Sequence, residues 1–117
     1  MHGTNVVVKA APYLPNTEVW DPIMSITEKD LKLMQEWGTT IVRLGVLWEA
    51  TERSPGVFDY EYLKKLEDLV NKFAEYGMVT MLDNHQDLLS RKLCGEGMPS
   101  FYTPTDLEDY CPWTLVG

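Results

Sequence analysis

Apolar positions along the chain follow a helical period in two segments. In residues 25–37 they fall on one stripe, and Ser25 and Glu28 have the spacing of a capping box. In residues 61–76 they share one face, while most of the charged side chains lie off it. A glycine follows each segment, as is common after a helix. The pattern therefore predicts two amphipathic helices.

Short apolar runs rich in β-branched residues cover residues 5–9, 40–46 and 78–82. They predict three strands, in the order β-α-β-α-β. Alternation of this kind is typical of parallel sheets with right-handed crossovers, and the continuous runs favour strands covered on both faces. The periodicity of the apolar positions fits a barrel and a doubly wound open sheet equally well. Because three parallel strands leave two free edges, we expect that the chain is not an autonomous domain.

Composition narrows the classes of partner. The chain has 117 residues, of which 44% are hydrophobic and 24% charged, and its net charge is -8. This composition is typical of a soluble globular chain, but a complete (β/α)₈ barrel needs roughly 250 residues. The negative charge disfavours nucleic acid as a partner. No apolar run could span a bilayer, and no signal-peptide core follows the first methionine, so either the start is cytosolic or an N-terminal segment is missing.

The two cysteines and the absence of common motifs disfavour several kinds of site. Cys94 and Cys111 are too few for a four-ligand zinc site and lack the spacing of a redox pair. A disulfide between them and two free thiols both remain open. The chain has no GxGxxG, Walker or G-x-S-x-G pattern, which disfavours nucleotide chemistry and serine hydrolysis.

Polar side chains gather where the predicted strands end. Lys9 ends the first strand, Arg43 lies in the second with Trp48 after it, and residues 83–87 (Asp-Asn-His-Gln-Asp) end the third. The C-terminal ends of parallel strands collect at one pole, where α/β enzymes build their sites. We therefore expect these side chains to converge.

Each polar group has a plain structural alternative. Arg43 is flanked by apolar residues and should meet a carboxylate, either in a structural ion pair or as the support of a catalytic group. Residues 83–87 suit the binding of sugar hydroxyls, although a capped strand end has a similar composition. His85 and Asp87 have the spacing of metal ligands, but no third ligand is evident, so we predict no metal site.

Aromatic residues are frequent in the loops expected at this pole. Such rings could stack on a sugar or lie under a lipid chain, and ordinary loop packing is the alternative for any single ring. They are Tyr13, Trp20, Trp48, Phe101 and Tyr102.

Several motifs resemble the N-terminal part of glycoside hydrolase family 5, and within it the endoglycoceramidases and their glucosylceramidase-like relatives. The likeness runs through most of the chain. It includes Gly3-x-Asn5-Val6-x-x-Lys9, Pro12-Tyr13-x-Pro15, Trp37-Gly38, Ile41-Val42-Arg43-Leu44-Gly45-Val46-x-Trp48, Pro55-Gly56-Val57 and Asp83-x-His85-Gln86-Asp87. The most specific part is Ser90-Arg91-Lys92 followed by Cys94-Gly95-Glu96-Gly97 and Pro99.

The resemblance implies an α/β fold, the N-terminal β-α-β-α-β portion of an incomplete (β/α)₈ TIM barrel. Residues 1–117 would be one part of a single glycosidase domain, truncated after the third strand and its loop. The implied activity is hydrolysis of O-glycosyl bonds: retaining cleavage between glycan and ceramide in glycosphingolipids, without a metal or organic cofactor. The acid/base and nucleophile glutamates would lie downstream, so neither Glu49 nor Glu96 is expected to be the nucleophile.

The resemblance also implies roles for residues that are present. Arg43 would lie beneath the nucleophile, and Lys9, His85 and Asp87 would hydrogen-bond the sugar next to the ceramide, with Trp48 nearby. The expected partner is a glycosphingolipid or another β-glycoside, reached through transient contact with a membrane surface or lipid micelle. A secreted or lysosome-like compartment would fit the family.

Two departures from the family pattern leave the preferred glycan and lipid open. Glu49-Ala50 stands in place of Pro-Gly, and Ser100-Phe101 stands in place of Asp-Trp. Three alternatives also remain: a truncated sugar-binding fragment without catalysis, another family 5 activity such as that of a β-glucanase or β-glucosidase, and an unrelated small α/β binding module.

Overall fold

The computed structural model describes residues 2–104 and residue 111. Three parallel strands form one sheet in the order β1 (Gly3–Val6), β2 (Ile41–Val46) and β5 (Val79–Asn84). The register pairs Asn5 with Arg43 and Arg43 with Met81, so these three residues lie on the same face of the sheet. The predicted parallel β-α-β-α-β arrangement is confirmed.

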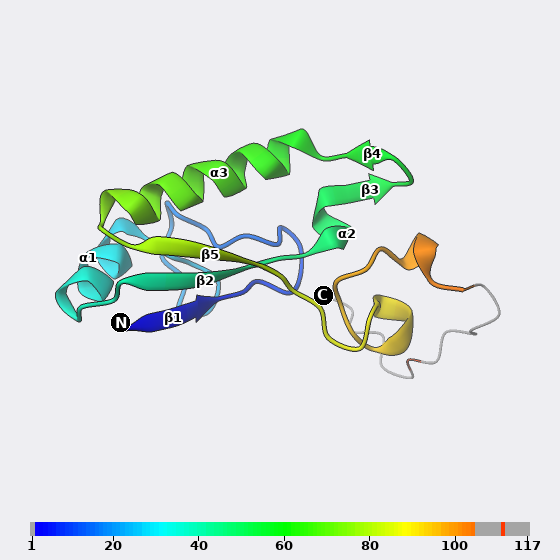
Figure 1. Ribbon diagram of the computed structural model, residues 1–117, viewed down its shortest axis with the longest axis horizontal. Coiled ribbons are helices and arrows are strands. Elements are labelled where there is room, and N and C mark those ends of the chain that lie inside the picture. The colour runs from blue at the N-terminus through cyan, green and yellow to red at the C-terminus, as the bar shows by residue number, and fades with distance from the viewer. Residues whose placement is uncertain (1, 105–110, 112–117) are drawn as a thin grey trace.

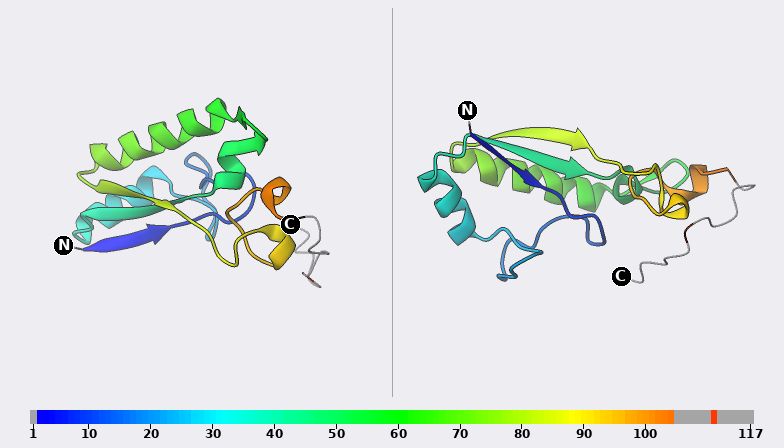
Figure 2. Two further views of the ribbon diagram at one scale, coloured as in Figure 1. Left: turned by 45° about the vertical axis from the view of Figure 1, so that its right-hand side comes forward. Right: turned by 90° about the horizontal axis from the view of Figure 1, so that it is seen from below.

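Two long helices connect the strands and lie on the same face of the sheet, as Figures 1 and 2 show. They are α1 (Glu28–Glu36) and α3 (Tyr60–Glu75). When neighbouring strands follow one another in chain order, right-handed crossovers place every helix on one side. A doubly wound sheet has helices on both faces, so the arrangement favours a barrel wall.

The core lies between this face of the sheet and the helices. Phe73 of α3, Leu31 of α1 and Val42 of β2 are each fully buried. Because burial of such a side chain contributes roughly 1.5–3 kcal/mol, the helices are held to the sheet mainly by these contacts. The sheet's other face is more open, and Met81 of β5 is exposed on it.

Short elements at the C-terminal ends of the strands complete the fold. Helix α2 (Trp48–Thr51) leads into a hairpin of β3 (Glu52–Ser54) and β4 (Val57–Phe58), where the sequence predicts only a turn. Two 3₁₀ turns follow β5, η1 (Arg91–Leu93) and η2 (Ser100–Tyr102). In the part of the chain that the structure describes, every helix is too short or too polar to cross a membrane.

The predicted start of α1 and the predicted end of β1 are wrong. Helix α1 begins at Glu28 rather than at residue 25, and its capping box joins Thr27 to Asp30, whose carboxylate accepts from the Thr27 amide at 2.8 Å. Ser25 instead donates its hydroxyl hydrogen to the Asp21 carbonyl at 2.7 Å. Strand β1 ends at Val6, before the predicted end at residue 9, and beyond it the Val7 side chain crowds the backbone of Gly45.

The prediction that the strands are covered on both faces also fails for β5. Val79 and Met81 on one face and Leu82 on the other are all exposed. Among the described residues, β5 pairs only with β2. The strand is therefore an edge of the sheet that the described residues form.

Candidate functional site

A cluster of charged side chains lies at the C-terminal ends of the strands. The Lys9 ammonium donates a hydrogen bond to Asp87 Oδ2 and lies 2.8 Å from Glu96 Oε1. The hydrogen bonds with Asp87 and then Glu96 raise the pKa of Lys9, and those with Lys9 and then Glu96 lower the pKa of Asp87. Lys9 and Asp87 therefore both stay charged at neutral pH. We call Lys9, His85, Asp87 and Glu96 the pole cluster.

Glu96 reaches the pole cluster because two glycines let its backbone approach the chain after β5. The amides of Asp87 and Glu96 donate to each other's carbonyls at 3.0 and 2.9 Å. A Cβ on Gly95 would lie 1.8 Å from the Asp87 carbonyl oxygen, and one on Gly97 would lie 2.4 Å from Gln86 Cβ. Gly97 also has a φ of +123°, which favours glycine. Residues with side chains cannot take these two places without moving Glu96.

His85 is oriented by Asp83, which also binds Arg43. Asp83 Oδ2 lies 2.9 Å from His85 Nδ1 and 2.7 Å from an Arg43 guanidinium nitrogen. A carboxylate only accepts hydrogen bonds, so Nδ1 carries the hydrogen and Nε2 of a neutral ring is an acceptor. Nε2 is buried, and among the described residues it has no hydrogen-bond partner. It faces Asp87 Oδ2 at 3.5 Å and Glu96 Oε1 at 3.8 Å inside the pole cluster.

The structure brings together most of the side chains that the sequence singles out. Lys9, His85 and Asp87 are in one cluster, and Arg43 is linked to it through Asp83. The polar and ring contacts of the Trp48 side chain are with other residues. Its indole N–H donates to Glu52 Oε2 at 2.6 Å, and its ring packs on Tyr102 with centroids 5.1 Å apart. The roles of these residues toward a sugar stay predictions.

Two members of the site were not assigned a role from sequence. Asp83 falls within the polar run 83–87, and the sheet register places it two residues after Met81 on the face that carries Arg43. This spacing could have identified it as the carboxylate that Arg43 needs. For Glu96 the signal is the pair of flanking glycines, Gly95 and Gly97, which is typical of a backbone that must pack closely.

The expectation that His85 and Asp87 lack a third potential metal ligand is wrong. Their ligand atoms and one from Glu96 all lie within 4.8 Å of one another. The Lys9 ammonium, however, contacts both carboxylates. Lys9 already supplies the positive charge that a metal ion would bring. The absence of a metal site stays a prediction.

Glu49 holds the loop that carries Glu96 against α2. Its carboxylate accepts from Arg91 at 2.9 and 3.1 Å and from the Gly97 amide at 3.2 Å, and its own amide donates to the Gly97 carbonyl at 2.7 Å. Arg91 also donates to the Lys9 carbonyl. Glu49, which departs from the family pattern, therefore holds the loop next to the pole cluster in place.

Cys94 and Cys111 form a disulfide, with Cα atoms 4.8 Å apart. This resolves the alternative that the sequence left open. Cys94 directly precedes Gly95, so the bond anchors the loop at the residue before its closest approach to Asp87. The tail over residues 105–110 and 112–117 lies outside the described residues.

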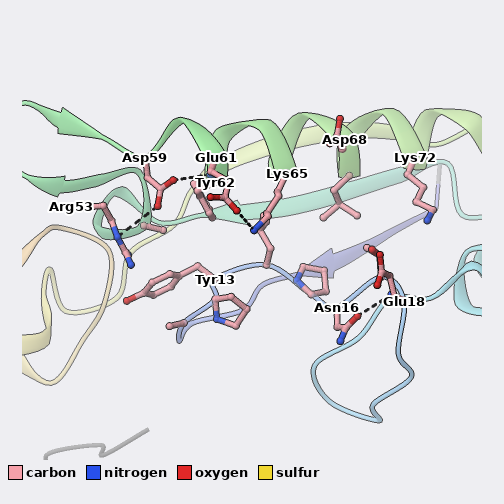
Figure 3. Close-up of a pocket in the computed structure, with 17 residues that line it drawn as sticks. Tyr13, Asn16, Glu18, Arg53, Asp59, Glu61, Tyr62, Lys65, Asp68 and Lys72 are labelled. Atoms are coloured by element: carbon pink, nitrogen blue, oxygen red, sulfur yellow. Dashed lines mark hydrogen bonds and ion pairs between the residues drawn. The ribbon is translucent and has the colours of Figure 1, made fainter.

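A hollow of about 750 Å³ lies on the helix side of the sheet, between residues 11–18 and α3 (Figure 3). Two pairs of its charged side chains form ion pairs, Arg53 with Asp59 at 3.8 Å and Lys65 with Glu61 at 2.7 Å. None of the pole-cluster residues lines this hollow. Trp20 is also on this side, beside Glu28 and Lys72, and the prediction that it lies at the pole is wrong because residues 10–26 run back along the helices.

Comparison with known proteins identifies the family. The profile of the family Cellulase (glycosyl hydrolase family 5) matches residues 2–113. An endoglycoceramidase from Cyanea nozakii is 41% identical over 114 residues, covering 97% of this chain and 22% of that protein. A glucosylceramidase from Rhizopus delemar is 30% identical over 122 residues, covering 86% of this chain and 18% of that protein.

Solved structures of endo-glycoceramidase II from Rhodococcus sp. are similar in fold. Its lactosyl-enzyme intermediate matches with a TM-score of 0.72 and 35% identity, over 90% of this chain and 25% of that one. Its ganglioside GM3 complex matches with a TM-score of 0.69 and 33% identity, over 90% of this chain and 24% of that one. The chain thus spans about a fifth to a quarter of the length of these relatives. On the extent of the family match and the identity to these relatives, the chain belongs to glycosyl hydrolase family 5.

Proposed function

We propose that residues 1–117 form the sugar-binding first part of a (β/α)₈-barrel glycosidase domain. We further propose that the complete polypeptide containing them cleaves the β-glycosidic bond between glycan and ceramide in glycosphingolipids. The one-sided helices support the barrel, because each wall segment of a barrel carries its helices outside. The names of the endoglycoceramidase relatives support the substrate class.

The observation that carries the proposal is the free Nε2 atom of His85 within the pole cluster. It is a buried acceptor without a partner among the described residues, and Asp87 Oδ2 lies 3.5 Å away. A sugar hydroxyl can donate to one acceptor and accept from another group. His85 Nε2 and Asp87 would accept from neighbouring hydroxyls of one sugar, and the Lys9 ammonium would donate to one of them.

The same geometry assigns a supporting role to Arg43. Its guanidinium has five N–H donors, and the ion pair with Asp83 at 2.7 Å uses one of its nitrogens. The remaining donors can hold a catalytic carboxylate from a neighbouring strand. Arg43 and His85 both bind Asp83. Asp83 would therefore fix both the residue that supports the nucleophile and the residue that binds the sugar.

We place the catalytic acid/base and nucleophile outside residues 1–117. Glu49 is engaged by Arg91 and the Gly97 amide, and Glu96 by Lys9. A nucleophile needs an open carboxylate about 5–5.5 Å from the acid/base group. The retaining course draws support from the lactosyl-enzyme intermediate of the Rhodococcus relative. In such a course one glutamate forms a glycosyl-enzyme, and water assisted by the other then releases the sugar.

Hydrolysis by the complete polypeptide tests the proposal. We expect intact lactose from lactosylceramide and intact glycan from ganglioside GM3 in detergent micelles. Replacing His85 with alanine should raise KM strongly, whereas Glu61→Gln, a change in an exposed ion pair with Lys65, should leave it unchanged. Glucose released from glucosylceramide alone would indicate a glucosylceramidase.

Two other outcomes would replace the proposed activity. Cleavage of cello-oligosaccharides without cleavage of either glycolipid would assign a β-glucanase-like activity, which the description of the matching family favours. Binding of the GM3 glycan without release of product would assign a non-catalytic sugar-binding role.

A further inference from the structure

Glu52 is a buried carboxylate surrounded by neutral donors. Only 4% of the residue is exposed. Its oxygens accept from the Trp48 indole N–H at 2.6 Å, the Gly56 amide at 2.7 Å and the Tyr102 hydroxyl at 2.7 Å. Burial of an anion is costly unless its oxygens are satisfied, and these three bonds satisfy them. The arrangement joins α2, the β3–β4 turn and η2 at one point.

The two aromatic donors are held by their polar ends while their rings stay accessible. Trp48 is 39% exposed and Tyr102 is 44% exposed, and their ring centroids are 5.1 Å apart. Phe101 extends the group, with its centroid 4.7 Å from that of Tyr102. Rings fixed in this way lose little conformational entropy when a ligand stacks on them.

The aromatic pair lies next to the pole cluster. Trp48 is followed by Glu49, whose amide donates to the Gly97 carbonyl at 2.7 Å and whose carboxylate accepts from the Gly97 amide at 3.2 Å. Gly97 directly follows Glu96 of the pole cluster. The backbone that carries Trp48 is therefore tied to the loop that carries Glu96. Aromatic faces stack on the apolar face of a pyranose ring, which carries only C–H groups.

We propose that Glu52 is a positioning residue that fixes Trp48 and Tyr102 as a stacking surface for a sugar ring of the substrate. This inference rests on the proposed glycosidase function. The proposed effect is preorganisation of the two rings. Without the carboxylate both rings could rotate, so a sugar that stacks on them would first have to order them. The Gly56 bond ties the same carboxylate to the hairpin turn, which keeps Glu52 itself in place.

The test compares Glu52→Gln with Glu61→Gln in the complete polypeptide that contains residues 1–117. Glu61 is exposed and pairs only with Lys65 among the described residues, so its variant is a matched control. In the NMR spectrum of a ¹⁵N-labelled sample, the Trp48 indole N–H signal is assigned by its loss in Trp48→Phe. In Glu52→Gln, but not in Glu61→Gln, this signal should move toward the position of an indole without a hydrogen bond. KM for lactosylceramide in detergent micelles should rise about three- to tenfold with kcat unchanged, because stacking is lost equally from bound substrate and transition state.

Several outcomes would overturn the proposal. One is an unchanged Trp48 indole signal in Glu52→Gln, and another is a KM equal to that of Glu61→Gln. A fall in kcat at constant KM, in step with the fraction of folded protein, would show that Glu52 serves stability alone. If Glu52→Gln does not fold, Tyr102→Phe removes a single donor from the carboxylate and should still raise KM, and an unchanged KM there would refute the role.

An acid titration of the wild-type protein gives an independent readout. Hydrogen bonds from the Gly56 amide, then Tyr102, then Trp48 lower the pKa of Glu52. The position of the Trp48 indole N–H signal should therefore stay constant as the pH falls, until the pH is below the usual pKa of a glutamate. A change at the ordinary value would contradict the geometry. If the complete polypeptide cleaves no β-glycoside, the proposed function fails, while the indole signal still decides whether Glu52 holds Trp48.

Discussion

Replacing Gly95 with alanine should disable the pole cluster without adding or removing any charge. The new Cβ would lie 1.8 Å from the Asp87 carbonyl oxygen and 2.7 Å from its carbonyl carbon, where ordinary contact begins near 3.4 Å. These are backbone atoms that no side-chain rotation can move. The two segments must therefore separate by about 1.5 Å.

The size of the effect follows from the bonds between these segments. The reciprocal Asp87–Glu96 amide bonds, at 3.0 and 2.9 Å, would both exceed bonding distance. At about 1 kcal/mol each, their loss lowers the free energy of unfolding by about 2 kcal/mol. Glu96 would also withdraw from Lys9, and a misplacement of about 1 Å in a binding group can cost about 100-fold in activity.

The assay measures both urea-induced unfolding and kcat/KM on lactosylceramide, with Gly38→Ala as the control. Gly38 has a φ of +77° and no atom within 4 Å of an added Cβ. Alanine there should cost about 1–2 kcal/mol through backbone strain alone. The two variants should therefore lose similar stability, and only Gly95→Ala should lose activity. If Gly95→Ala keeps kcat/KM within about twofold of the wild type, the close approach of Glu96 is not needed.

Three further predictions concern the core, helix α1 and Lys9. Phe73 is fully buried, so Phe73→Ala should lower the free energy of unfolding by about 3–5 kcal/mol in urea titrations, and a loss below about 1 kcal/mol would contradict the described core. The Thr27 hydroxyl and then the Thr27 amide lower the pKa of Asp30 from its ordinary 3.8, so its stabilising effect is present above that value and is lost as the pH falls through the folded pKa. Helical circular dichroism should show this acid-dependent loss, and Asp30→Asn should abolish it. Lys9→Met removes the ammonium shared by two carboxylates and should raise KM about 10- to 100-fold, whereas the exposed Lys29→Met should have no effect.

Long periodic segments were the most predictable part of the fold. Helix α3 repeats its apolar positions over four turns and lies within one residue of its predicted bounds. The start of α1 was misplaced because Ser25 and Thr27 are both good caps, and only the contact of Ser25 with Asp21 decides between them. Helix α2 and the β3–β4 hairpin are too short to give a period.

The candidate site was predictable to the extent that it depends on strand ends. Parallel strands bring Lys9 and residues 83–87 to one pole of the sheet, regardless of the conformation of the loops. Glu96 could not be placed in this way, because its position depends on a loop that folds back onto Asp87. Trp20 was misplaced for the same reason, since the direction of its long loop is set by packing against the helices and leaves no local sequence signal.

The central claim is that this chain binds the sugar while the bond-breaking carboxylates lie elsewhere in the complete polypeptide. Covalent labelling tests it most directly. The complete polypeptide is incubated with 2-deoxy-2-fluoro-β-lactosyl fluoride, which traps a glycosyl-enzyme in retaining glycosidases, and the labelled residue is mapped by mass spectrometry. We predict a labelled glutamate outside residues 1–117 and much slower labelling in Lys9→Met. A label on Glu49 or Glu96, or no label at all, would contradict the claim.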